Sequence, residues 1–165
     1  MAAGSTYTPI ATQTLGSAAA SVTFSSISGT YTDLVLVVNA KTAATASCWV
    51  TLNSDSGSNY SDTILEGDGS TAVSARQSNQ TRGYTTYNSG PVSTNFSFNQ
   101  IVNFMNYSNT TTYKTFLSRA NEASRATETM VTMWRSTSAI TSIVYESNSN
   151  FQSGSTFTLY GIAAA

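Results

Sequence analysis

Three carboxylates stand close together in the chain: Asp62, Glu66 and Asp68. A pair of carboxylates flanking a sugar linkage is the chemistry of glycoside hydrolysis, in which one acts as acid and the other as base or nucleophile. Glu66 and Asp68, however, belong to a Glu-Gly-Asp-Gly run that is typical of a turn carrying solvated charge. Asp62 and Glu66 therefore form a candidate glycosidase pair, and a turn with surface charge is the interpretation that we prefer.

A second acidic stretch, residues 55–59, places oxygen atoms at alternate positions, as a calcium loop does. It lacks an acidic closing ligand at the right distance. Asp and Asn also bond to their own backbone in tight turns. An Asx-type turn is the preferred interpretation, and we leave open whether the loop binds an ion.

Other catalytic and cofactor-binding patterns are missing from the sequence. There is no histidine, which removes the commonest general base and the usual partner of a nucleophilic Ser or Cys. Cys48 is the one cysteine, beside Trp49 and Val50, and we expect it to be a small buried hydrophobe. No glycine-rich phosphate loop occurs. We therefore predict no catalytic residue, no cofactor, no metal and no enzymatic activity.

Aromatic and basic residues in the polar middle of the chain form the candidate binding set. Aromatic rings stack on sugars or anchor protein contacts, and arginines bind anionic groups. The alternative is that these rings cover the edges of the fold or line a subunit interface. The candidate partner-binding residues are Tyr60, Arg76, Arg82, Tyr84 and Tyr87, with Trp49 as a further aromatic.

Composition defines the fold class. Ser and Thr make up 54 of the 165 residues, whereas only 9% are charged and the net charge is −1. The charge balance gives no footprint for nucleic acid. Thr favours strands, and Ser and Asn favour turns, while nine Tyr, seven Phe and two Trp supply a core. We predict an all-β protein of one domain.

Short apolar or alternating runs bounded by Ser, Asn and Gly predict the strands. Runs at 7–15, 21–27, 34–38, 47–52, 63–65, 95–105, 112–119, 130–135, 140–145 and 157–162 fit this pattern. Residues 34–38 are apolar without a break, which is typical of a strand buried on both faces in the middle of a sheet. Residues 70–93 predict a long excursion with one or two short strands, and a helical turn is considered for residues 119–129.

These runs predict an antiparallel two-sheet β-sandwich, jelly-roll-like, with about eight to ten strands. Pro9 places the first strand at an edge or a strand start. We expect residues 1–20 to be an N-terminal arm or edge strand and residues 21–165 a single β-sandwich domain. No run is long and apolar enough to cross a membrane, and no secretory signal is evident.

The stretches 52–61, 106–115, 134–140 and 154–162, with 7–11 and 30–34 upstream, resemble small Ser/Thr-rich structural proteins of tailed bacteriophages. The resemblance spans nearly the whole chain. Similar domains are attributed to capsid decoration (cement) proteins and to tail-fibre or receptor-binding tips. The family carries no catalytic residues to transfer to this sequence.

The resemblance implies a non-enzymatic virion protein, in first place a capsid decoration protein that stabilises the head. Its expected partners are the major capsid protein or other virion proteins and further copies of itself, as a trimer. The alternative is a receptor- or carbohydrate-binding domain of a tail fibre or spike, with a host-surface glycan as partner. The expected location is the virion, assembled in the host cytoplasm, with neither nucleic-acid binding nor membrane insertion.

Overall fold

The computed structural model describes residues 6–87 and 90–163 of the chain. Within those residues the regular secondary structure consists of twelve β-strands and no helix. They are β1 (Tyr7–Thr14), β2 (Ala19–Phe24), β3 (Asp33–Ala40), β4 (Cys48–Leu52), β5 (Tyr60–Gly67), β6 (Ala72–Gln80), β7 (Gly83–Thr86), β8 (Phe98–Met105), β9 (Lys114–Glu122), β10 (Ala126–Trp134), β11 (Ile143–Phe151) and β12 (Thr156–Ile162). The all-β prediction is confirmed, and the predicted count of eight to ten strands is too low.

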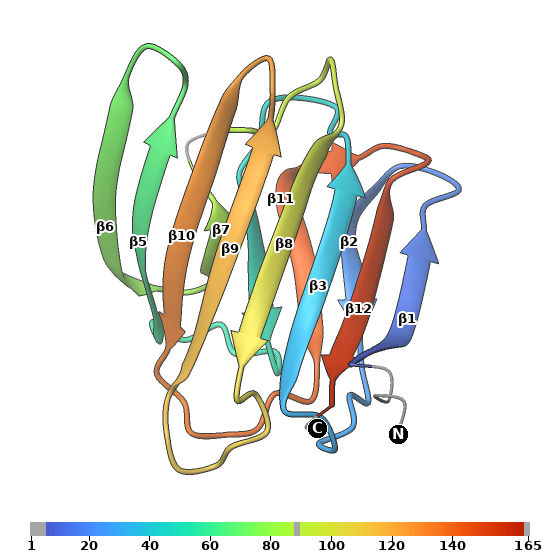
Figure 1. Ribbon diagram of the computed structural model, residues 1–165, viewed down its shortest axis with the longest axis vertical. Coiled ribbons are helices and arrows are strands. Elements are labelled where there is room, and N and C mark those ends of the chain that lie inside the picture. Colours follow the sequence, from blue (N-terminus) through green and yellow to red (C-terminus); the bar gives the residue numbers. More distant parts are fainter. Residues whose placement is uncertain (1–5, 88–89, 164–165) are drawn as a thin grey trace.

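The strands form two antiparallel sheets that pack face to face as a β-sandwich (Figure 1). The larger sheet has eight strands in the order β1-β12-β3-β8-β9-β10-β5-β6, and the smaller has four in the order β2-β11-β4-β7. From β1 to β5 the chain changes sheet at every step, which is consistent with the predicted jelly-roll-like sandwich.

The hydrophobic core lies between the two sheets. On β8, Phe98, Val102 and Phe104 point inward and are at most 1% exposed, because successive side chains of a strand lie on opposite faces. Behind them, Tyr145, Phe151 and Phe157 pack with ring centroids 5.1 to 5.7 Å apart. Cys48 is fully buried in the same core, as its apolar neighbours predict.

Strand β3 lies inside the larger sheet, between β12 and β8, as its apolar run predicts. The prediction that both of its faces are buried holds only in part. Leu34, Leu36 and Val38 face the core, whereas on the other face Val35 is 6% exposed and Val37 is 37% exposed. A second layer covers only one face of this sheet, so Val37 remains open.

The stretch 70–93, predicted as a long excursion with one or two short strands, contains two strands, and one of them is long. Strand β6 runs for nine residues, and β7 follows it in the other sheet. Every residue of β6 is at least partly exposed, because the strand lies at the edge of the larger sheet (Figure 1). A strand with no buried face has no apolar alternation, so its sequence resembles a loop.

The helical turn considered for residues 119–129 is also wrong. Strands β9 and β10 occupy this region as a hairpin, with Glu122 paired with Ala126. A turn joins them, in which the Arg125 N–H donates to the Glu122 carbonyl at 2.9 Å. Ala and Glu here alternate with polar residues at the period of a strand, and the sheet neighbours on either side outweigh their helix preference.

The first strand lies at the edge of the larger sheet, paired along its length with the last strand, β12. The pairing shifts register between Pro9 and Ala11. Ile10, Ala11 and Leu15 pack against the core from this edge. The described residues include no helix long and apolar enough to span a bilayer.

Candidate functional site

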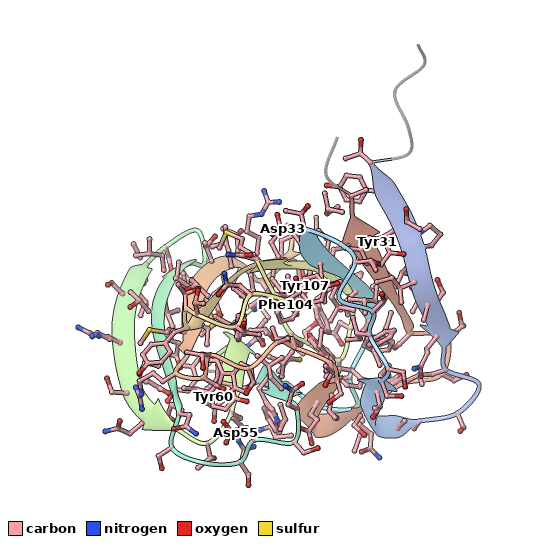
Figure 2. The ribbon with its side chains drawn as sticks, turned by 90° about the horizontal axis from the view of Figure 1, so that it is seen from below. Tyr31, Asp33, Asp55, Tyr60, Phe104 and Tyr107 are labelled. Atoms are coloured by element: carbon pink, nitrogen blue, oxygen red, sulfur yellow. The ribbon has the colours of Figure 1, made fainter. Side chains whose placement is uncertain are left out.

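Tyr60, predicted to contact a partner, lies in the core instead. It is fully buried, and its ring stacks on Trp134 with centroids 6.4 Å apart. Its hydroxyl accepts from the Leu52 N–H at 3.1 Å and donates to the Asp55 carbonyl at 3.2 Å. Figure 2 shows Tyr60 and Asp55 next to each other at one side of the molecule. Its place at the start of β5 points the ring inward, so Tyr60 is a structural residue.

The loop at Asp55 is an Asx-type turn. Its Oδ1 accepts from the Gly57 N–H at 2.8 Å, and its Oδ2 accepts from the Asn59 side chain at 2.9 Å and the Trp134 indole at 2.6 Å. Burial alone raises the pKa of Asp55, but these N–H donors hold it below the ordinary value. The carboxylate thus ties the loop to β10 through N–H groups.

Three of the predicted residues come together on the smaller sheet, around Trp49. The Arg82 guanidinium carbon lies 4.3 Å from the Trp49 ring centroid. The Trp49 and Tyr84 rings meet edge to face at 6.0 Å, and Tyr84 and Tyr87 do so at 5.2 Å. Adjacent strands produce this row, since Trp49 of β4 pairs with Tyr84 of β7. We call Trp49, Arg82, Tyr84 and Tyr87 the aromatic cluster.

Glu146, which sequence reasoning missed, holds the base of the aromatic cluster. It is the cross-strand partner of Trp49 on β11. Its Oε2 accepts from the Trp49 indole at 3.1 Å and from the Thr51 hydroxyl at 2.8 Å. Glu146 lies almost a hundred residues from Trp49, and no spacing rule connects them. Only the sheet pairing brings the two together.

The exposure of the aromatic cluster limits its chemistry. Trp49 is only 9% exposed and carries Arg82 over its ring, while Tyr84 and Tyr87 are half-buried. A sugar stacks on an open ring face, and the Trp49 face is already occupied by a cation. The cluster instead offers tyrosine hydroxyls and a guanidinium, a set suited to hydrogen bonding with a polar ligand.

Arg76 does not join the aromatic cluster. It lies on β6, exposed, as the cross-strand partner of Thr63 in the larger sheet. Arg82 and the tyrosines belong to the stretch that enters the smaller sheet. The five predicted residues therefore divide into one core residue, three members of one cluster and one residue on a separate edge.

Beneath β7, polar side chains of the larger sheet point into the sandwich and bond to the β7 backbone. The Thr85 carbonyl accepts from the Gln100 side chain at 2.6 Å and from the Ser118 hydroxyl at 2.7 Å. The Tyr84 carbonyl accepts from Thr132 at 2.8 Å. An unpaired buried carbonyl is costly, so these inward polar residues are part of the fold.

A carboxylate cluster lies at the same place, on the inner face of β5 and β10. Glu128, absent from the predicted acidic group, pairs across the strands with Glu66, and its Oε1 accepts from the Tyr87 N–H at 2.9 Å. Burial, with a smaller repulsion from Glu66 and Asp62, raises the pKa of Glu128 to about 8. Burial also raises the pKa of Asp62 to about 6.

Gly90 shows how tightly this carboxylate cluster is packed. A side-chain carbon at Gly90 would lie 2.4 Å from the Glu128 Oε2 and 3.2 Å from the Glu66 Oε2. Within the described residues, both Asp62 oxygens and the Glu128 Oε2 have no hydrogen-bond partner. The candidate glycosidase pair, Asp62 and Glu66, thus lies on the inner face of β5.

Asp68 behaves as its turn-like context predicts. It accepts from the Ser70 N–H at 2.8 Å and the Thr71 N–H at 2.6 Å, which closes the β5–β6 hairpin. These bonds lower the pKa of Asp68. Across residues 6–87 and 90–163, no group of three or more His, Cys, Asp or Glu side chains is arranged to hold a metal ion.

The side of the larger sheet that faces away from the smaller sheet is a second candidate surface, which we call the outer face. Cross-strand pairs align Val35, Asn103, Leu117 and Val131 in one row from β3 to β10. A neighbouring row begins with Val37 and Ile101. Val35 is buried, but other apolar side chains of this face are well exposed. The exposed fractions are 37% for Val37, 48% for Val131, 45% for Met105 and 61% for Leu65.

Charge is almost missing from the centre of the outer face. In the two rows just named, Arg119 is the one charged side chain between β3 and β10; it pairs with Ile101 on one side and Thr129 on the other. It borders a shallow depression of about 280 Å³ together with Asn99 and Asn121. The outer face is thus broad, apolar and amide-rich, a composition that suits contact with another protein.

A scan against models of known protein families finds no match, and neither does a search of the curated proteins. Among solved structures, the chain is similar at a TM-score of 0.32 to two variants of the alginate lyase Aly36B. One of them, in complex with alginate trisaccharide, is 9% identical, and the alignment covers 92% of this chain and 80% of that one. The other, in complex with alginate tetrasaccharide, is 11% identical and covers 93% and 80%. A likeness this weak carries no inference about function.

Proposed function

We propose that this chain is a non-enzymatic structural protein of a tailed-phage virion, a capsid decoration protein that acts through its outer face. The supporting observation is the mismatch on β3. Its uninterrupted apolar run is typical of a strand covered on both sides, yet Val37 is 37% exposed in the isolated chain. A partner laid over the outer face removes this mismatch.

The size of the outer face suits such a contact. Eight strands spaced about 4.8 Å apart give a sheet roughly 34 Å wide, and six residues along a strand add about 20 Å. The footprint is on the order of 700 Å², close to the roughly 800 Å² per partner of a stable interface. The partners we propose are the major capsid protein and further copies of this chain, with a trimer as the first expectation.

The test measures how well two variants, Val131→Glu and Thr23→Glu, bind to phage heads that lack this protein. Val131 lies on the outer face, whereas Thr23 is an exposed residue of β2 on the opposite side of the molecule. Burying an unpaired carboxylate at an apolar contact is costly, so we expect Val131→Glu to lose at least tenfold in occupancy. Thr23→Glu should bind like the wild type.

Electron microscopy of particles carrying the labelled protein locates it. Copies spread regularly over the head are the expected result. Label confined to the tail, or equal binding by the two variants, contradicts the decoration role and the outer face as its contact surface.

A second candidate is the receptor- or carbohydrate-binding domain of a tail fibre, and the aromatic cluster is the observation that favours it. Its test is a glycan array with Tyr84→Ala and Tyr87→Ala. Tyr113→Ala, at an exposed tyrosine outside the cluster, is the matched control. Binding that disappears in the first two variants and survives in the control supports this function over decoration.

A further inference from the structure

The four free edges of the two sheets differ in how their backbone is protected. These edges are β1 and β6 in the larger sheet and β2 and β7 in the smaller. A free edge presents a row of N–H and C=O groups that can pair with another chain, and proteins usually block it.

Three of the edges carry a visible block. On β1, Pro9 has no N–H to donate, and the register shift beside it interrupts the row. On β2, the Thr23 carbonyl is occupied by the Gln13 side chain at 2.6 Å. On β7, side chains of the larger sheet bond to successive carbonyls, as described above.

The fourth edge, residues 72–77 of β6, carries none of these devices. Its register with β5 is regular from Ala72 to Gln77 and shifts only beyond Gln77, and the stretch contains neither proline nor lysine. No side chain of the described residues bonds to its backbone; the first such bond comes just beyond, where Gln80 donates to the Ser78 carbonyl. Every residue of this stretch is at least partly exposed.

We propose that β6 is a docking edge, to which an extended segment of a different protein adds as a ninth strand of the larger sheet. Main-chain hydrogen bonds supply the pairing, and alternate side chains supply the choice of partner. This inference uses an edge rather than a face and does not depend on the proposed function.

The side chains of β6 define the chemistry of the segment. Arg76 points to the outer face beside Thr63 and has no hydrogen-bond or ion-pair partner among the described residues. Val73 and Ala75 point to the other face, where Val73 is 45% exposed. The segment that fits carries a carboxylate opposite Arg76 and small apolar residues on the other face.

Charge also argues against a second copy of this chain as the occupant. None of its four edge strands contains an aspartate or a glutamate. Two β6 strands paired about a two-fold axis bring two Arg76 side chains to the same face, and like charges across a strand pair are destabilising. The carboxylate must therefore come from another protein.

The experiment uses the full chain and two synthetic nine-residue peptides of alternating valine and serine, one with glutamate at its centre and one with lysine. Titration is followed by backbone amide NMR. We expect the glutamate peptide to perturb the amides of residues 72–77 and to bind at least tenfold more tightly than the lysine peptide. In Arg76→Glu, an exposed substitution, we expect the preference to reverse.

Proline substitutions test the backbone pairing separately. N–H groups of adjacent strand residues point to opposite sides, so one of Ser74→Pro and Ala75→Pro removes a bond to β5 and the other removes only an outward donor. The variant that keeps its melting temperature should lose the peptide. Three results overturn the proposal: no shift at residues 72–77, equal affinity for both peptides, or a wild-type dimer in light scattering that the tolerated proline variant dissociates.

Discussion

At the scale of single residues, the most unusual group is Glu128. It is buried beside Glu66, and burial raises its pKa to about 8. The group is therefore mostly protonated at neutral pH, and its Oε2 can then carry a proton toward Glu66. A buried acid that stays neutral avoids the large cost of an unpaired internal charge.

This residue predicts a stability that depends on pH. A carboxyl whose folded pKa lies above its unfolded value stabilises the fold below the unfolded pKa, and that contribution is lost as the pH rises through the folded pKa. For Glu128 this contribution is lost between pH 4.5 and about pH 8. The pKa of Asp62 is raised from 3.8 to about 6, so Asp62 adds to the loss in the lower part of that range. We expect the free energy of unfolding to fall by roughly 2–4 kcal/mol between pH 5 and pH 9.

The matched variant is Glu128→Gln, measured by urea unfolding at pH 5, 7 and 9. It should resemble the wild type at pH 5 and be the more stable protein at pH 9, because glutamine keeps a carbonyl for the Tyr87 N–H and never ionises. A wild-type unfolding free energy that does not change across this range contradicts the neutral, buried Glu128.

At the scale of elements, the shared carbonyl of β7 makes a quantitative prediction. The Thr85 carbonyl accepts from both Gln100 and Ser118, while Gln100 also accepts from the Tyr145 hydroxyl. Ser118→Ala should cost about 0.5–1 kcal/mol, because one donor remains. Gln100→Leu should cost about 1–3 kcal/mol, because it also removes the partner of a buried tyrosine.

The double variant checks whether the two donors serve one acceptor. With both removed, the Thr85 carbonyl is buried without a partner, so the loss should exceed the sum of the single losses. A double-mutant cycle by urea unfolding measures this excess. Strict additivity means that the two side chains act independently of that carbonyl.

These elements also explain which parts of the structure could be predicted from sequence. Strands with one buried face, such as β8 and β12, have the expected alternation, and their positions were predicted. Strand β6 has no buried face and β10 buries Glu128 and Thr132, so neither shows a simple pattern. The clustering of Arg82, Tyr84 and Tyr87 follows from local sequence, but Trp49 and Glu146 join them only through sheet pairing.

At the scale of the whole molecule, the two ends of the chain contribute unequally. Strand β1 is an edge that pairs with β12 alone, whereas β12 lies between β1 and β3. Removing residues 1–15 should leave a cooperative fold with a lower melting temperature. Removing residues 156–165 should abolish cooperative unfolding, because Phe157 and Leu159 of the core are lost and β3 becomes a bare edge.

Circular dichroism during heating distinguishes the two truncations. If both truncated proteins lose the cooperative transition, residues 1–20 are not merely an arm or edge strand added to a domain that spans residues 21–165. A transition that persists without residues 156–165 contradicts the central place of β12.

The position of β12 also sets when this protein can fold during its synthesis. The ribosome makes β1 first and β12 last, yet these two strands are partners, and β3 waits for the same strand. Until β12 emerges, the apolar run of β3 has one side unpaired. Such distant pairings make folding slow. The nascent chain therefore remains open to chaperones and to other chains until β12 has been made.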